Sequence, residues 1–141
     1  METRGTAVIV VDTNIISYRW MASPYSELAS KALAKDPDWI APILWRSEFR
    51  NIIAGAIRHK LVDLEAAIHI MGEAERHFAD REFAVSSRAV LNLVASSACS
   101  AYDCEFAALA QEQRVPLITL DRQLLRDFPH VAIALEKFVR A

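Results

Sequence analysis

The stretch Val8–Asn14, VIVVDTN, decides the fold class and raises a question about charge. Its four consecutive branched apolar residues are typical of a strand buried on both faces, as in a parallel sheet covered by helices. The next residue, Asp12, is of a type that is rarely buried without a partner. We therefore ask why an interior strand ends in a carboxylate and what shares its charge.

The rest of the chain alternates between strand-like and helix-like segments. This alternation predicts an α/β fold, with a central, mostly parallel sheet between two helical layers. Strands are predicted over 6–11, 39–41, the start of 85–97, 115–120 and 131–135, and helices over 24–34, 42–60, 64–78, the later part of 85–97, 101–113 and 122–128. The 141 residues contain no linker or repeat, so one domain spanning 1–141 is expected.

Composition excludes several classes of protein. The net charge of −2 gives no overall attraction to nucleic acid, although it does not exclude a nucleic-acid substrate. The three glycines, Gly5, Gly55 and Gly72, are too far apart for a dinucleotide-binding G-x-G-x-x-G loop or a Walker A loop. The two cysteines, Cys99 and Cys104, suit a reducing cytoplasm and are too few for a zinc site. No signal peptide or membrane span is expected.

Four acidic residues stand where apolar residues are expected. Asp12 and Asp121 each follow a predicted strand, so both should emerge at the carboxyl edge of the sheet, where ligands of such folds bind. Glu48 and Asp103 interrupt the apolar faces of two predicted helices, near the helix starts. Each acid alone has an ordinary explanation, such as helix capping, the helix dipole or an arginine partner. Together they suggest a carboxylate cluster.

A carboxylate cluster requires compensation for its own repulsion. Two unit charges about 4 Å apart repel by roughly 4 kcal/mol at an effective dielectric constant near 20. Oxygen ligands without histidine suit Mg²⁺ or Mn²⁺, which typically promote phosphoryl chemistry. Thr13, Asn14 and Thr119 flank the acids and offer neutral hydrogen-bonding groups that can hold a carboxylate or a metal-bound water in place.

Four short motifs, in order and at this spacing, resemble a PIN domain. They are VVDTN at residues 10–14, the pair Ser47-Glu48, SAYD at residues 100–103 and PLITLD at residues 116–121. The spacing is similar to that of the VapC-type toxins of toxin–antitoxin pairs, and the resemblance covers residues 7–135.

The resemblance implies a PIN-like three-layer α/β/α sandwich and a Mg²⁺- or Mn²⁺-dependent endoribonuclease. It implies that Asp12 and Asp103 ligate the metal directly, and that Asp121 and Glu48 bind through water or complete a second metal site. Hydrolysis would leave 3′-hydroxyl and 5′-phosphate ends. The resemblance further implies a homodimer in the cytoplasm and a small antitoxin that covers the acidic groove.

Several alternatives remain open. The chain could be a PIN-domain nuclease of general RNA processing, or a PIN fold retained as a non-catalytic binding module. An aspartyl phosphatase would need a second aspartate where Asn14 stands, and a receiver domain would need a strand-end lysine, whereas the only late lysine is Lys137.

The 101–113 helix also lacks the glycine that often closes it, so its last turn must strain another residue or end differently.

Overall fold

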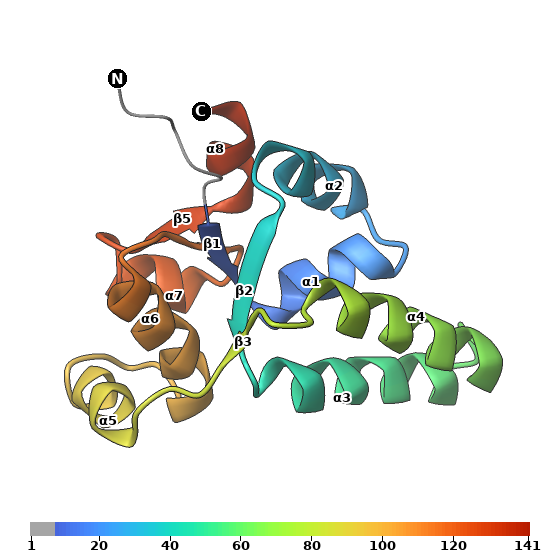
Figure 1. Cartoon of the computed structure of the whole chain (residues 1–141), viewed down its shortest axis with the longest axis horizontal. Helices are drawn as coiled ribbons and strands as arrows, with labels where there is room; N and C mark the ends of the chain where they lie inside the picture. The colour runs from blue at the N-terminus through green and yellow to red at the C-terminus, as the bar shows by residue number, and fades with distance from the viewer. Residues whose placement is uncertain (1–7) are drawn as a thin grey trace.

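The computed structural model describes residues 8–141 and contains a five-stranded, all-parallel sheet (Figure 1). The strand order is β3-β2-β1-β4-β5. The strands are β1 (Val8–Val11), β2 (Asp38–Pro42), β3 (Glu82–Phe83), β4 (Leu117–Thr119) and β5 (Ala132–Ala134). The α/β prediction with a parallel central sheet is therefore confirmed.

Eight helices connect and extend these strands within residues 8–141. They are α1 (Thr13–Trp20), α2 (Ser26–Lys35), α3 (Trp45–Arg58), α4 (Leu64–His77), α5 (Ser87–Ala95), α6 (Ala101–Gln113), α7 (Arg122–Asp127) and α8 (Leu135–Arg140). The α4 start agrees with the sequence prediction, because the Asp63 side chain accepts a hydrogen bond from the backbone N–H of Ala66 at 2.8 Å. No helix in this range is both long and apolar enough to cross a membrane.

The helices form two layers on either side of the sheet (Figure 1). Helices α1 to α4 lie on one side of the strands, and α5, α6 and α7 lie on the other. Helix α6 contacts β1, β2 and β4, while α2 packs against both α1 and α8. This arrangement agrees with right-handed crossovers, because the chain adds strands in one direction from β1 to β3 and then returns to β4 on the opposite side of β1.

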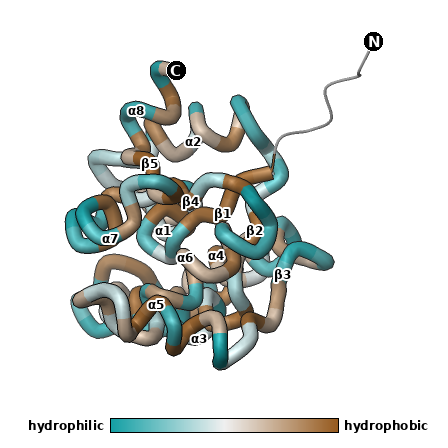
Figure 2. The backbone as a smooth tube through the Cα atoms, turned by 90° about the vertical axis from the view of Figure 1, so that its left-hand side faces the viewer, coloured by the Kyte–Doolittle hydropathy of each residue, from teal (hydrophilic) through white to brown (hydrophobic). Residues whose placement is uncertain are grey.

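The core is apolar and aromatic. Figure 2 shows hydrophobic residues along the central strands and hydrophilic residues in the outer connections. The largest side chains that are wholly removed from solvent include Trp39 on β2, Trp45 and Phe49 on α3, and Phe106 on α6. Trp39, Trp45 and Phe49 are therefore core residues, as burial of apolar surface favours, whereas Tyr25 is 42% exposed.

Three boundaries predicted from the sequence are wrong. The edge strand β3 precedes the segment 85–97, which holds only α5. Pro42 ends β2 instead of opening the next helix, which begins at Trp45. The last predicted strand is three residues long, and the chain then enters α8, because Leu135 and Phe138 bury one face of that helix against the core. Residues 6 and 7 of the first predicted strand lie outside the described residues.

Helix α6 ends without glycine, as the sequence requires. Arg114 adopts a left-handed conformation with φ 57°, and its N–H donates to the carbonyl oxygens of Ala110 and Gln111. A non-glycine residue in this region costs roughly 1 kcal/mol. The first alternative, a strained non-glycine cap, is therefore the one that occurs.

The order of the strands defines where a site can form. The chain leaves β1 toward β2 on one side, whereas β4 pairs with β1 on the other side. In doubly wound sheets such a reversal opens a crevice at the carboxyl ends of the two strands. Asp12 follows the last residue of β1, and Asp121 follows β4 by two residues, so both acids lie at this crevice.

Candidate active site

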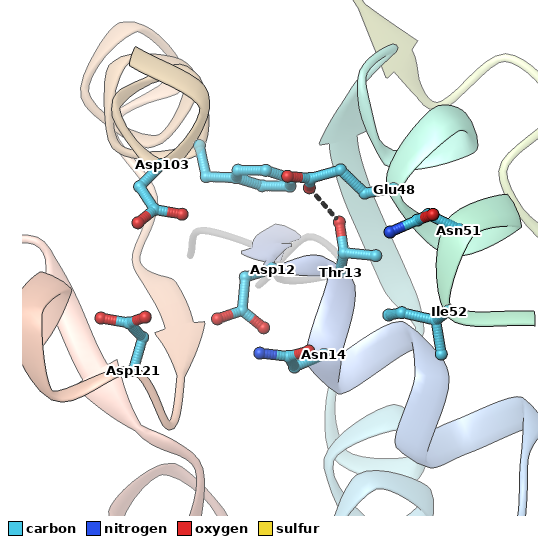
Figure 3. A pocket seen from close by; sticks show the side chains of 9 residues that line it. Asp12, Thr13, Asn14, Glu48, Asn51, Ile52, Asp103 and Asp121 are labelled. Atoms are coloured by element: carbon cyan, nitrogen blue, oxygen red, sulfur yellow. Dashed lines mark hydrogen bonds between the residues drawn. The ribbon is translucent and has the colours of Figure 1, made fainter. Parts of the chain in front are cut away.

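A cavity of about 240 Å³ lies at the crevice between the ends of β1 and β4. It is lined by all four acids singled out in the sequence and by five other residues: Asp12, Thr13, Asn14, Glu48, Asn51, Ile52, Asp103, Phe106 and Asp121. Figure 3 shows the carboxylates of Asp12, Asp103 and Asp121 turned toward a common space. The fold therefore brings together side chains that are up to 109 positions apart in the sequence.

Asp12 caps helix α1 while its carboxylate lines the cavity. Its Oδ1 accepts a hydrogen bond from the backbone N–H of Ile15 at 3.1 Å, and its Oδ2 accepts one from the Thr119 hydroxyl. The residue is only 6% exposed. Each carboxylate oxygen has a second lone pair, so these bonds orient the group without exhausting its ability to bind a cation.

Asp121 plays the same double role at the end of β4. Its Oδ1 accepts a hydrogen bond from the backbone N–H of Leu124 at 2.9 Å, which caps α7. Its own N–H donates to the Thr119 hydroxyl oxygen at 2.9 Å. Thr119 does not line the cavity; it is fully buried beneath it and connects the two strand-end acids through a single hydroxyl.

Asp103 enters the cavity from the first turn of α6. The Ser100 hydroxyl caps this helix by accepting a hydrogen bond from the Asp103 N–H at 3.1 Å, so the start of the helix and the direction of the acid are set together. The ordinary explanation, an acid in the first turn, is thus also correct. It does not conflict with a place in the cluster, because the side chain faces the two strand-end aspartates (Figure 3).

Glu48 lies on the opposite wall, in the first turn of α3. The Thr13 hydroxyl donates to Glu48 Oε1 at 2.6 Å, and Figure 3 shows the glutamate turned toward this threonine. No arginine among residues 8–141 pairs with Glu48, because Arg46 on the same helix pairs with Glu75 and Glu82. Thr13 therefore takes the place of a cation beside this carboxylate.

The cluster is electrostatically unfavourable when its acids are all ionised. Burial raises the pKa of Asp12 to about 6, and the charges of Asp121 and Asp103 add to the rise, while the Thr119 and Ile15 hydrogen bonds oppose it. Burial likewise raises the pKa of Asp103, with a further contribution from Asp121. Burial raises the pKa of Glu48 as well, and the Thr13 hydroxyl counters part of that rise.

The donor set fits a hard divalent cation. Three aspartates converge from β1, α6 and β4, and Mg²⁺ and Mn²⁺ prefer carboxylate and water oxygens. Within residues 8–141, however, no three acidic, histidine or cysteine side chains are close enough to hold one ion as they stand. Binding one cation by three of these side chains would therefore require the carboxylates to move toward one another.

Asn51 is a cavity residue that was not predicted from the sequence. Asn51 follows Glu48 by three positions on α3, so the helical period could have placed both on one face. Phe106 stands in the same relation to Asp103 on α6. Three arginines close in sequence to the acidic motifs, Arg19, Arg122 and Arg126, do not line this cavity.

The fold and the acidic crevice at its switch point define a class: an α/β protein with a carboxylate site suited to metal-dependent chemistry. The family model for the PIN domain matches residues 9–132, and the chain therefore belongs to the PIN domain family. PIN domains are generally nucleases that use divalent metal ions.

A solved structure supports the fold. The crystal structure of PAE2754 from Pyrobaculum aerophilum is similar to this chain, with a TM-score of 0.75 over 95% of each chain and 20% sequence identity. At that identity the similarity shows the fold alone. A comparison with curated proteins finds no match.

Proposed function

We propose that this PIN domain is an endoribonuclease that hydrolyses RNA phosphodiester bonds with Mg²⁺ or Mn²⁺. The observation that carries the proposal is the convergence of three aspartates and one glutamate in a single cavity at the switch point of the sheet. The raised pKa values of Asp12, Glu48 and Asp103 support it, because ionisable groups with perturbed pKa values cluster at functional sites.

The residues divide into those that hold a cation and those that hold the acids. Asp12, Asp103 and Asp121 would ligate the cation, which when bound polarises a water molecule and stabilises charge on the phosphate. Thr119 orients Asp12, and Thr13 orients Glu48. Within residues 8–141 no group donates to Glu48 Oε2, so this oxygen is available to accept a hydrogen bond from a water molecule.

Asp12→Asn tests the catalytic role. Asparagine keeps the side-chain oxygen that caps α1 but removes the charge. We expect the wild-type protein to cleave RNA in Mg²⁺ or Mn²⁺, to stop in EDTA, and to lose at least 100-fold in kcat/KM with this substitution, as for the removal of one strong electrostatic group. Cleavage at the wild-type rate by Asp12→Asn would refute the assignment.

Asp63→Asn is the matched control. Asp63 is also an N-cap aspartate, with an Oδ1 that accepts from a backbone N–H three residues later, but it does not line the cavity. We expect this variant to retain full activity. Equal losses in both variants would assign the effect of Asp12→Asn to helix capping instead of catalysis.

The biological role proposed is that of the toxin in a type II toxin–antitoxin pair. This proposal rests on the spacing of the motifs in VVDTN, Ser47-Glu48, SAYD and PLITLD. A small antitoxin covering the acidic cavity, and a homodimer, are part of the same proposal. The exposed apolar side chains of Leu61, Leu64 and Ile68 support a protein partner of some kind, since clustered exposed apolar surface marks interaction sites.

Expression in a host cell, with and without the product of a small adjacent reading frame, tests this role. Growth arrest that needs Asp12 and is relieved by the adjacent product supports the toxin. Cleavage without arrest supports general RNA processing, and RNA binding without cleavage supports a non-catalytic binding module. The two free cysteines, Cys99 and Cys104, support a cytoplasmic location for either role.

A further inference from the structure

A second hollow adjoins the acidic cavity. It has a volume of about 230 Å³ and lies between the first turns of α3 and α6, lined by Leu44, Ser47, Glu48, Asn51 and Tyr102. Glu48 and Asn51 line both spaces, and Figure 3 shows the two side chains on the α3 wall of the acidic cavity. The two spaces therefore share a wall.

Tyr102 presents an aromatic ring to solvent at the edge of this hollow. It is 62% exposed, although tyrosine carries a large apolar ring, and it directly precedes Asp103. The Ser100 cap fixes the turn of α6 that carries both residues. The ring and an acid of the site are thus positioned by the same local structure.

The chemistry of the hollow suits a nucleobase and not a phosphate. Of the described residues that line it, none is cationic, and the Glu48 carboxylate repels an anion. The neutral lining combines the Leu44 side chain with the Ser47 hydroxyl and the Asn51 amide, which offers both donors and an acceptor. Exposed aromatic rings stack on bases of single-stranded nucleic acid, and amides form hydrogen bonds with base edges.

We propose that this hollow is a base-binding subsite, in which Tyr102 stacks on a nucleobase of single-stranded RNA next to the bond that is cut and Asn51 contacts the edge of that base. The subsite rests on the proposed nuclease function. It deepens that function by giving the acidic cavity a neighbouring group that positions the substrate. It also predicts a preference for unpaired RNA, because a paired base cannot turn its face to a side chain.

Three substitutions of Tyr102 separate stacking from simple apolar contact. Tyr102→Phe keeps an aromatic face, Tyr102→Leu keeps apolar volume, and Tyr102→Ala removes both. We expect KM for a single-stranded RNA to be unchanged in the first and to rise about tenfold or more in the other two, in line with the loss of one base–aromatic stack. The kcat should change little, because the ring lies outside the acidic cavity.

Binding is measured as well as cleavage. RNA binding is measured by the fluorescence anisotropy of fluorescein-labelled oligonucleotides in Ca²⁺, and a gel verifies that the RNA stays intact. In a series of oligonucleotides, a single abasic nucleotide is placed at successive positions along the strand. One position should weaken binding to the wild-type protein about tenfold and leave Tyr102→Ala unaffected. Leu91→Ala, which shortens an apolar side chain of similar exposure (60%) on α5 outside both spaces, is the matched control and should behave as wild type.

The outcomes distinguish the subsite from the nuclease function. Unchanged KM and binding in Tyr102→Ala, or a Tyr102→Leu variant equal to Tyr102→Phe, would overturn the subsite while leaving cleavage intact. Binding that depends on Tyr102 without any cleavage in Mg²⁺ or Mn²⁺ would support the subsite and overturn the nuclease function. Absence of both binding and cleavage would overturn both.

Discussion

Thr119→Val is the most informative substitution in the acidic site, because one buried hydroxyl serves two acids. The Thr119 hydroxyl donates to Asp12 Oδ2 and accepts from the backbone N–H of Asp121 at 2.9 Å. The residue is fully buried. Valine keeps the shape and the β-branched strand preference of threonine, so the substitution removes the two hydrogen bonds and little else.

The cost follows from the two partners that are left behind. A buried polar group that loses its partner costs about 1 to 3 kcal/mol, with the higher value for a charged acceptor. The Asp12 carboxylate and the Asp121 N–H together give an expected loss of about 3 kcal/mol in the free energy of unfolding. A domain with a typical stability of about 5 to 15 kcal/mol remains folded after such a loss.

The same substitution should move the pH profile of cleavage. The Thr119 hydrogen bond lowers the pKa of Asp12, which burial has raised to about 6. Without it the pKa rises further, and because a cation requires the ionised carboxylate, the acidic limb of the profile shifts to higher pH. Urea unfolding in EDTA measures the stability, and the cleavage rate between pH 5 and 9 measures the shift.

Thr119→Ser is the control, because serine restores the hydroxyl. It should recover most of the stability and the wild-type position of the acidic limb. A Thr119→Val variant with wild-type stability and an unmoved pH profile would show that the hydroxyl does not support Asp12. A variant that loses stability without any shift would limit Thr119 to a role in the fold.

Three further predictions concern the charged residues inside and outside the acidic cavity. In EDTA the Asp12 carboxyl should contribute a fall of up to about 3 kcal/mol in the free energy of unfolding as pH rises from 4 to 7, because its pKa is raised from 3.8 to about 6 and the folded state thus binds its proton more tightly than the unfolded state. Urea midpoints should show this fall, and Asp12→Asn should reduce it to the smaller part that the raised pKa values of Asp103 and Glu48 contribute. Thr13→Val removes the hydrogen bond that lowers the pKa of Glu48. In a cleavage assay, kcat/KM should therefore drop about tenfold at pH 6 and less at pH 8. Thr13→Ser keeps the hydroxyl and should match the wild type in the same assay. Arg46→Met breaks the ion pair with Glu82 and should lower the free energy of unfolding by about 1 to 2 kcal/mol in urea. The kcat/KM should not change, because Arg46 lies outside the cavity. A loss of kcat/KM in this variant would contradict the assignment of the cavity walls.

The sequence was sufficient to place the acids at one edge of the sheet. The apolar run before Asp12 is continuous, and the run before Asp121 is interrupted only by Thr119, so both strands are typical of a sheet buried on both faces; the alternation of strands with helices then favours a parallel sheet. Parallel strands share a carboxyl edge, which brings these two residues together irrespective of their separation in the chain.

The sequence was insufficient where tertiary packing overrides local pattern. Val85 was included in a strand because it belongs to an apolar stretch, whereas β3 is the preceding pair Glu82–Phe83. Glu82 is stabilised in this edge strand because its carboxylate accepts a hydrogen bond from the Trp45 indole N–H at 2.6 Å and another from the Arg46 guanidinium. These partners lie up to 37 positions away in the sequence, so the local β-propensity of residues 82–83 does not predict this strand.

The ordinary and the functional explanations of the acids turn out to be compatible. Asp12 and Asp121 cap α1 and α7, and Asp103 occupies the first turn of α6, as a purely structural account requires. Capping occupies one lone pair of one oxygen and fixes the direction of the carboxylate. Three helix starts that meet at the switch point of a parallel sheet therefore deliver three carboxylates to one cavity. The Asp12 and Asp121 carboxylates are oriented by the capping bonds they accept, and Asp103 is positioned through its backbone N–H, which the Ser100 hydroxyl caps. Substitution by asparagine separates the two roles, since it retains the capping oxygen and abolishes the charge.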